Sequence, residues 1–278
     1  PAERGPGNGV QVAGYKVGMM LGGGVVLILL GSLGWATSFY CLATLIILAT
    51  VPVLAYREPP LPRARPHTEP RHLFYTFLDF IRQPRIWPWI LVVALYKAGD
   101  AFGSGMTKPM LIDSGLSLVT VGWLSGVLGM VAGIAGALMG GFLIPRLGRI
   151  RALFWFGLFQ AFSLLGYYLI ARGETALPLI CMVSVLEHFI GGMATAALFT
   201  LMMDACRIGH AGTDYTVQAS IQVVVAGGLH MLSGFSAGYL GYEAHFLISF
   251  AIGLTVLGFV LFWAKSVPVG QQNNWKNS

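Results

Sequence analysis

The sequence predicts an all-α integral membrane protein, and two observations carry that prediction. Of the 278 residues, 56% are hydrophobic and only 10% are charged, and the mean hydropathy is +0.72. Soluble domains carry about 25% charged residues, so this composition is that of a membrane protein. The apolar residues also gather into stretches of about 20, the length of a helix that crosses a bilayer.

Eight stretches are long and apolar enough to form transmembrane helices. Short connections such as GSLGW and GYEAH would make neighbouring spans antiparallel. The expected spans are residues 10–33, 36–55, 86–112, 118–144, 152–171, 178–205, 215–240 and 245–264. The lipid bilayer is therefore the first partner that the sequence predicts.

One connection differs from the others, because it is long and rich in Pro and Arg. It reads YREPPLPRARPHTEPRH, from Tyr56 to His72, and this composition excludes both a helix and a core segment. The following LFYTFLDFIRQ has apolar residues at helical spacing, which favours either an interfacial helix on the membrane or packing against a neighbouring helix end. The chain begins PAERGPGNG, without the features of a signal peptide, and we expect a fragment whose beginning is missing.

Lys and Arg residues are distributed unevenly between the two sides of the expected bundle. If the N-terminus is cytoplasmic, only Arg172 and, near a helix end, Lys108 fall on the outer side. The cytoplasmic set is then Arg4, Lys16, Arg57, Arg63, Arg65, Arg71, Arg82, Arg85, Arg146, Arg149, Arg151, Arg207, Lys265 and Lys276. This positive-inside pattern predicts that both chain ends and the Pro- and Arg-rich connection are cytoplasmic. It also accounts for the net charge of +6 without nucleic-acid binding, which requires a clustered basic face.

The three cysteines indicate neither a disulfide framework nor a metal site. Cys41, Cys181 and Cys206 lie inside or at the ends of apolar segments, without a CxxC pair or a His at metal-ligand spacing. We therefore expect no metal and no cofactor. An integral-membrane enzyme is an alternative class, but the sequence suggests no converging nucleophile, carboxylate pair or metal ligands, so we expect no catalytic residues. A non-transporting membrane sensor or a channel is a further alternative.

Glycine recurs along the span 118–144 at alternating spacings of four and three. The stripe consists of Gly122, Gly126, Gly129, Gly133, Gly136 and Gly140. A helix face without side chains lets a neighbouring backbone approach closely, which is how membrane helices associate. Two interpretations remain open: static packing, and a smooth contact along which helices rock during transport.

Four polar residues share one face of the span 86–112, namely Lys97, Asp100, Ser104 and Lys108. Charged groups in hydrocarbon are costly, so they face a bundle interior or a water-filled cavity and pair with one another. Lys97 reaches Asp100 one turn away. This face therefore predicts a substrate or proton path, with a purely local ion pair as the alternative; Lys108, near the helix end, is also placed to extend to the interface.

The span 178–205 carries Glu187 and His188, which are adjacent and point about 100° apart on a helix. Glu187 shares its face with small residues, and a titratable carboxylate there is a candidate proton carrier. His188 is a candidate relay, or alternatively a packing residue. Asp204, near the end of this span, is expected to be a boundary charge close to Arg207.

Two glutamines, Gln218 and Gln222, lie one turn apart in the span 215–240. Stacked amides offer donors and acceptors to a polar solute, or bond to neighbouring helices, and the sequence does not separate these roles. His230, deeper in the same span, is ambiguous. The candidate path therefore consists of Lys97, Asp100, Ser104, Glu187, His188, Gln218 and Gln222.

The connection GGFLIPRLGRIRAL resembles the cytoplasmic loop signature of the major facilitator superfamily. That signature has a Gly, three residues, Asp, a basic residue, any residue, Gly, and then two basic residues separated by one position. The matching residues are Gly141, Arg146, Gly148, Arg149 and Arg151. Pro145 stands where the signature has Asp, which puts the charge contact of that Asp in doubt.

Three longer stretches resemble the peptide–acetyl-coenzyme A transporter branch of that superfamily, in particular AmpG-type permeases. They are GNGVQVAGYKVGMMLGGG, LEHFIGGMATAALFTLMM and GTDYTVQAS. The resemblance implies an inner-membrane permease that imports anhydro-muropeptides, with the proton gradient as driving force. Siderophore permeases of the same branch are the alternative, because LYKAGDAFGSGMTKPMLIDSGLSLVTVGW resembles them equally.

The resemblance also implies a domain organisation, in which the chain holds helices 5 to 12 of a twelve-helix major-facilitator-type bundle. Residues 1–56 would then be the last two helices of the N-terminal half, and 57–84 a cytoplasmic loop between the halves with an interfacial helix. Residues 85–266 would be the six-helix C-terminal half, and 267–278 a cytoplasmic tail. A small polar solute and protons are the expected partners, and we expect a monomer.

Overall fold

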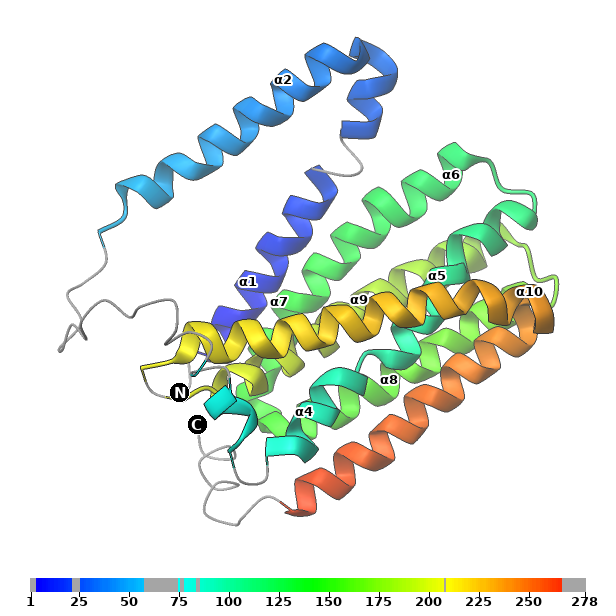
Figure 1. Cartoon of the computed structure of the whole chain (residues 1–278). Coiled ribbons are helices and arrows are strands. Elements are labelled where there is room, and N and C mark those ends of the chain that lie inside the picture. Colours follow the sequence, from blue (N-terminus) through cyan, green and yellow to red (C-terminus); the bar gives the residue numbers. More distant parts are fainter. Residues whose placement is uncertain are drawn as a thin grey trace.

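The computed structural model describes residues 4–21, 26–57, 75, 78–83, 86–207 and 209–266. Over these residues the chain is helical, and no strand occurs among them (Figure 1). The helices are α1 (Arg4–Met19), α2 (Val26–Ala55), α4 (Ile86–Leu95), α5 (Ala98–Asp113), α6 (Leu118–Gly122), the π-helical η2 (Trp123–Leu128), α7 (Gly129–Leu147), α8 (Arg149–Ala171), α9 (Leu177–Asp204) and α10 (Ala211–Ser266).

Two of the continuous helices reverse direction at a glycine with a positive φ. Gly34 in α2 has φ 75°, and Gly241 in α10 has φ 79°. This region of backbone conformation favours glycine. Figure 1 shows the chain doubling back at both points. The reversals fall in GSLGW and GYEAH, the connections that the sequence predicts between spans.

The other predicted spans correspond to helices, with three differences. The span 86–112 is interrupted at Tyr96 and Lys97, between α4 and α5, and the span 118–144 contains the wider π-helical turn of η2. The span 10–33 covers the second half of α1 and the start of α2, and its residues 22–25 lie outside the described residues.

Five helices in the described part of the chain are long and apolar enough to cross a membrane, which agrees with the predicted all-α membrane class. They are Leu33–Ala55, Val119–Leu147, Arg149–Ala171, Leu177–Asp204 and Ala211–Lys265. The first stands apart from the bundle, and only 6% of its most apolar window is buried.

The bundle is held together by three sets of helix contacts. α7 packs along α9, α10 packs along α5 and α8, and α1 lies against both α7 and α9. At one end, the rings of Trp89 in α4 and Trp263 in α10 are 4.9 Å apart. Toward the other end, Tyr167 in α8 stacks on Phe246 in α10 at 5.5 Å. These large side chains are buried in the core between the helices.

The predicted glycine stripe makes a backbone contact over only part of its length. A Cβ added at Gly136 would collide with the Phe189 carbonyl oxygen of α9, and one at Gly140 would lie 2.7 Å from Met193 Cα. Gly192 of α9 approaches the Gly133 carbonyl in the same way. α7 and α9 therefore touch backbone to backbone.

The other end of the stripe has a different environment. An added Cβ at Gly129 would lie 2.7 Å from the His188 ring, whereas at Gly122 and Gly126 no described atom lies within 4 Å. For Gly122 and Gly126, close packing stays a prediction. These two precede α7 by one to two turns, where the described bundle leaves the helix face open.

The Pro- and Arg-rich connection lies almost entirely outside the described residues, as do Arg63, Arg65, Arg71, Arg85 and Lys276 and the tail 267–278. Of the expected interfacial helix, the structure describes residues 75 and 78–83. Phe80 there is fully buried in the bundle core, beneath the Arg207 guanidinium at 5.8 Å. Phe80 therefore packs into the core of the bundle.

Candidate functional site

Lys97 and Asp100 form an ion pair inside the bundle. Lys97 lies at the break between α4 and α5, and its Nζ is 2.9 Å from Asp100 Oδ2 in the first turn of α5. The two side chains are 12% and 18% exposed. The pair expected from the sequence therefore exists, and it is largely removed from solvent.

Glu187 and His188 in α9 also contact each other, although neighbouring helix positions point apart. His188 Nδ1 lies 2.6 Å from Glu187 Oε2 and 2.9 Å from the Ser184 carbonyl oxygen. Since both neighbours are acceptors, Nδ1 carries a proton and donates. The other edge of the ring faces Gly129 of α7, where a side chain would leave it no room.

The two pairs converge on the same small space beside Gly191 of α9. An added Cβ at Gly191 would lie 3.8 Å from Glu187 Oε1 and 3.9 Å from Lys97 Nζ. It would also lie 3.2 Å from Gln160 Nε2, which reaches in from α8. The Glu187 and Asp100 carboxyl groups are within electrostatic range of each other. Helices α5, α8 and α9 therefore bring polar groups to one point.

A further lysine, Lys16 of α1, joins this cluster. Its Nζ lies against Gly133 of α7, 2.9 Å from where a Cβ would be. It is within electrostatic range of Lys97, Asp100 and Glu187. Placing Lys16 among the cytoplasmic charges is therefore wrong. The signal that could have found it is the one used for Lys97, a lone charge within an apolar stretch.

We call Lys16, Lys97, Asp100, Glu187 and His188 the buried polar cluster. Three helices that are distant in sequence contribute to it: α1, α5 with its preceding break, and α9. Two carboxyl groups there face two lysines and a histidine, so the charges nearly balance. Within the described residues, no group of three or more His, Cys, Asp or Glu residues could hold a metal ion.

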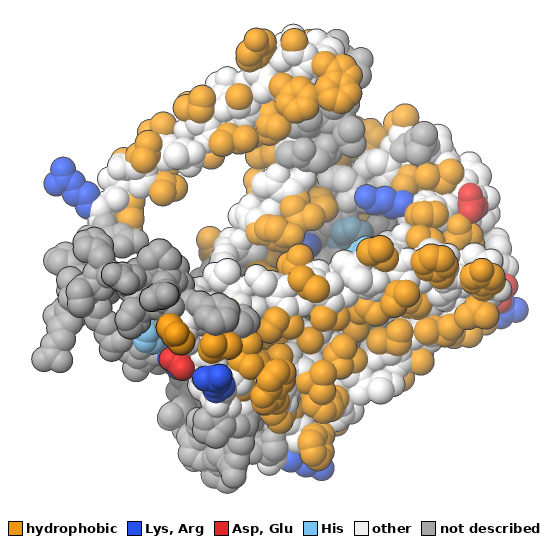
Figure 2. Space-filling model, viewed as in Figure 1, with side chains coloured by type: hydrophobic (Ala, Val, Ile, Leu, Met, Phe, Trp, Pro, Cys, Tyr) orange, Lys and Arg blue, Asp and Glu red, His pale blue; other side chains and the backbone are white. Residues whose placement is uncertain are grey.

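The remaining polar residues of α5 face a more open space. Ser104 Oγ lies 3.5 Å from His230 Nε2 of α10, and both Ser104 and Lys108 are exposed. Figure 2 shows a hollow between the first half of α10 and the helix formed by α6, η2 and α7, with basic and histidine side chains inside it. The predicted polar face therefore runs from the buried polar cluster into this hollow.

The two glutamines of α10 have different environments. Gln218 is fully buried; its Oε1 accepts from Trp89 Nε1 at 2.6 Å, and its Nε2 donates to the Met202 and Asp214 carbonyl oxygens, both at 3.1 Å. These bonds join α4, α9 and α10, so the interhelical role fits Gln218. Gln222, one turn further on, is half-buried.

The loop motif forms a charged junction at the end of the bundle that also holds Trp89 and Trp263. Gly148, with φ 82°, makes the tight turn between α7 and α8. Arg149 pairs with Asp204 at 2.7 Å, while Arg146 lies over the Phe142 ring at 4.0 Å. Gly141 meets α1, because an added Cβ at Gly9 would lie 3.1 Å from its Cα.

Arg207, beside this junction, is held by Asp214 at the start of α10. Asp214 Oδ1 accepts from Arg207 Nη2 at 2.7 Å, and Oδ2 accepts from Nε and from the backbone N–H at 2.9 Å. This fork raises the pKa of the Arg207 guanidinium above its usual range. The sequence predicts Asp204 as a boundary charge close to Arg207; in the structure Asp204 pairs with Arg149, and Arg207 pairs with Asp214.

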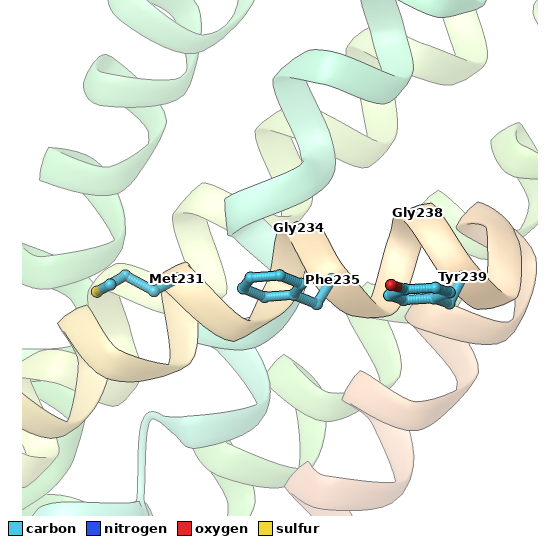
Figure 3. A pocket seen from close by; sticks show the side chains of 5 residues that line it. All are labelled: Met231, Gly234, Phe235, Gly238 and Tyr239. Carbon is cyan, nitrogen blue, oxygen red and sulfur yellow. The ribbon is translucent and has the colours of Figure 1, made fainter.

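An apolar groove lies on the outer side of α10. Met231, Phe235 and Tyr239 line it over Gly234 and Gly238, with a volume of about 420 Å³ (Figure 3). All five residues lie on one strip of the same helix. The groove contains no charged group and is separate from the buried polar cluster.

Comparison with known proteins places the chain in a family. Residues 1–229 match the model of the Major Facilitator Superfamily. The chain is 31% identical over 274 residues to the anhydromuropeptide permease of Escherichia coli K12, covering 98% of this chain and 56% of that protein. It is 21% identical over 265 residues to putative transporter AmpG 4 of Rickettsia conorii, covering 93% of this chain and 64% of the relative.

The chain thus spans about half to two thirds of the length of these relatives, and the similarity runs along nearly all of it. The family match includes the helices that carry the buried polar cluster and the loop with Gly148 and Arg149. On these grounds the chain belongs to the Major Facilitator Superfamily.

Proposed function

We propose that the chain is the larger part of a secondary active transporter that imports anhydro-muropeptides across the inner membrane, driven by the proton gradient. The observation that carries the proposal is the buried polar cluster, which lies inside a bundle of apolar helices. The similarity to the anhydromuropeptide permease supports the solute, because it covers 98% of this chain.

The cluster has the composition that proton coupling requires. Asp100 and Glu187 are close to each other, and each has cationic neighbours. Their cationic partners balance the two carboxyl groups, so the cluster is suited to binding a proton when a partner moves away and to releasing it when the partner returns. Lys16 comes from α1, whereas the other members come from helices α5 and α9. Movement of α1 against α7 and α9 would therefore alter the charge balance directly.

The distribution of charges supports the proposed orientation. One end of the bundle, where α7, α9 and α10 end, carries the basic residues Arg146, Arg149, Arg207 and Lys265. Arg172 lies at the opposite end, 4.0 Å from Glu243. By the positive-inside rule, the end of the bundle with these four basic residues is cytoplasmic. We propose that both ends of the chain also lie on the cytoplasmic side. The numbering of the helices as 5 to 12 of twelve, with residues 85–266 as one half, belongs to the same proposal.

The proposal is tested by uptake into cells whose own permeases are deleted and that express the full-length parent. Labelled anhydro-muropeptide and a ferric siderophore are offered side by side, with and without a protonophore. We expect muropeptide uptake that saturates and collapses with the protonophore. Siderophore uptake alone would show that the transported solute is a siderophore. If neither solute is taken up, the proposed solute class is wrong.

The role of the cluster is tested by neutralising it in the same assay. Lys97→Gln, Asp100→Asn and Glu187→Gln should each abolish uptake while the protein still inserts in the membrane. Glu243→Gln is the matched control, because it removes an exposed carboxylate at the end of the bundle. Wild-type uptake in all three cluster variants would contradict the proposed path.

A further inference from the structure

A small chamber lies beside Asp100, where α5, α8 and α10 meet. It has a volume of about 10 Å³, and its polar lining residues are Tyr96, Asp100 and Gln160. Glycines provide the space: Gly99 approaches the Ser249 carbonyl of α10, and Gly157 faces the Tyr96 hydroxyl. The chamber is distinct from the hollow, because Gln160 is only 3% exposed.

Two polar atoms of the chamber are buried without a hydrogen-bond partner. They are Asp100 Oδ1 and Gln160 Nε2. Leaving a buried donor or acceptor unsatisfied destabilises the folded protein, and more so when the group is charged. One atom is an acceptor and the other a donor, and the two residues that carry them line the same chamber. A molecule that accepts from the amide and donates to the carboxylate would satisfy both.

We propose that the chamber holds one water molecule, which accepts a hydrogen bond from Gln160 Nε2 and donates to Asp100 Oδ1. Its second hydrogen points to the Tyr96 hydroxyl oxygen. That oxygen is free to accept, because the Tyr96 hydroxyl donates its own proton to the Leu153 carbonyl at 2.7 Å. A buried water needs roughly 10–15 Å³ and two to four polar partners, and the chamber provides both.

The lining favours water over a cation. The Gln160 amide presents N–H groups, and Lys97 Nζ is 2.9 Å from Oδ2 of the same Asp100 carboxyl group. Both repel a positive ion. Water is the small ligand whose donors and acceptors match all three partners at once.

The water makes Gln160 a positioning residue for Asp100. Asp100 Oδ2 is held by Lys97, and the water would hold Oδ1, so the carboxyl group would be fixed at both oxygens. Gln160 is buried, so it is not exposed to a solute in the hollow. It would act only through the orientation of Asp100 relative to Lys97, Lys16 and Glu187. This last step rests on the proposed function, whereas occupancy of the chamber does not.

The direct test is a structure of the full-length parent at a resolution that shows ordered water, for the wild type and for Gln160→Met. We expect density between Asp100 and Gln160 in the wild type and none in the variant. A dry chamber in the wild type would overturn the proposal. This result is independent of transport, so it stands even if muropeptide uptake is not found.

The positioning role is tested by uptake kinetics in the same pair. Gln160→Met should lower the maximal rate by about 10-fold or more, with KM for the solute within about 2-fold of wild type, because misplacement of a reacting group affects rate rather than binding. Ser163→Ala is the control, since it removes another buried polar atom from α8, whose hydroxyl only donates to the Gln160 carbonyl at 2.7 Å. An unchanged maximal rate, or an equal loss in the control, would overturn the positioning role.

Discussion

Arg149 Nη1 lies 2.7 Å from Asp204 Oδ2, and the two side chains are only 5% and 1% exposed. The pair joins the start of α8 to the end of α9. The loop signature has an Asp where this chain has Pro145. The sequence therefore puts in doubt the charge contact that the signature Asp would make. Asp204 brings a carboxylate to the arginine cluster from a different helix, so a buried acidic partner is present despite Pro145.

Replacing Asp204 by Asn should destabilise the protein strongly. Removing one partner of a buried ion pair leaves the other charge uncompensated, which costs about 3–5 kcal/mol. The thermal unfolding midpoint of the full-length parent in detergent is the measurement. Arg151→Gln, which removes an exposed arginine of the same motif, should change the midpoint little. A double Arg149→Leu and Asp204→Leu variant that is no more stable than Asp204→Asn would contradict the explanation.

The contact between α7 and α9 predicts a contrast between two glycines of the same stripe. Gly136→Ala would place a methyl group on the Phe189 carbonyl oxygen, so α9 has to move. Overpacking of this kind typically costs about 1–3 kcal/mol. Gly126→Ala, the same change two to three turns earlier, meets no described atom within 4 Å. Unfolding midpoints measured in parallel should fall only for Gly136→Ala, and an equal fall for both would show that helix–helix contact is not the cause.

The positions of the helices and turns were predictable because their signals are local. Apolar stretches and the glycines at 34 and 241 mark spans and reversals without reference to the rest of the chain. Lys97 and Asp100 were predictable for the same reason, since they lie one turn apart on one helix. Their ion pair is confirmed.

The convergence of different helices was not predictable from these signals. Lys16 and Gln160 reach the cluster because α1 and α8 pack at a particular register against α9, which no single segment encodes. Glu187 and His188 point apart by helix geometry, yet their flexible side chains turn toward one another and toward the Ser184 carbonyl. Similarly, two glutamines one turn apart look equivalent until Trp89 of α4 is placed beside one of them.

The two glutamines should differ when each is replaced by Leu. Gln218→Leu removes the partners of Trp89 Nε1 and of two carbonyl oxygens in a fully buried site, which costs about 1–3 kcal/mol in unfolding free energy. Gln222→Leu should leave the unfolding midpoint near wild type. The midpoint in detergent decides between the roles, and a similar loss for both variants would contradict the structural assignment of Gln218.

Lys16 provides the sharpest prediction about transport, because it is the member of the buried polar cluster contributed by α1. Lys16→Gln leaves two carboxyl groups facing Lys97 and His188, so the balance of charge shifts by one unit in a low-dielectric site, where such changes are costly. We expect muropeptide uptake to fall by at least about 10-fold. A 10-fold fall in rate requires the activation free energy to rise by only about 1.4 kcal/mol. Lys16→Arg keeps the charge and should retain part of the uptake.

The control for Lys16 is Lys265→Gln, which removes a lysine from the last turn of α10, remote from the cluster. The decisive comparison is the double variant Lys16→Gln and Glu187→Gln, assayed for unfolding midpoint as well as uptake. If Lys16 balances the carboxyl groups, removing one of them should recover stability that Lys16→Gln loses, although uptake stays absent. Uptake and midpoint both at wild-type level in Lys16→Gln would mean that α1 does not contribute to the charge balance, and the cluster would then be a property of α5 and α9 alone.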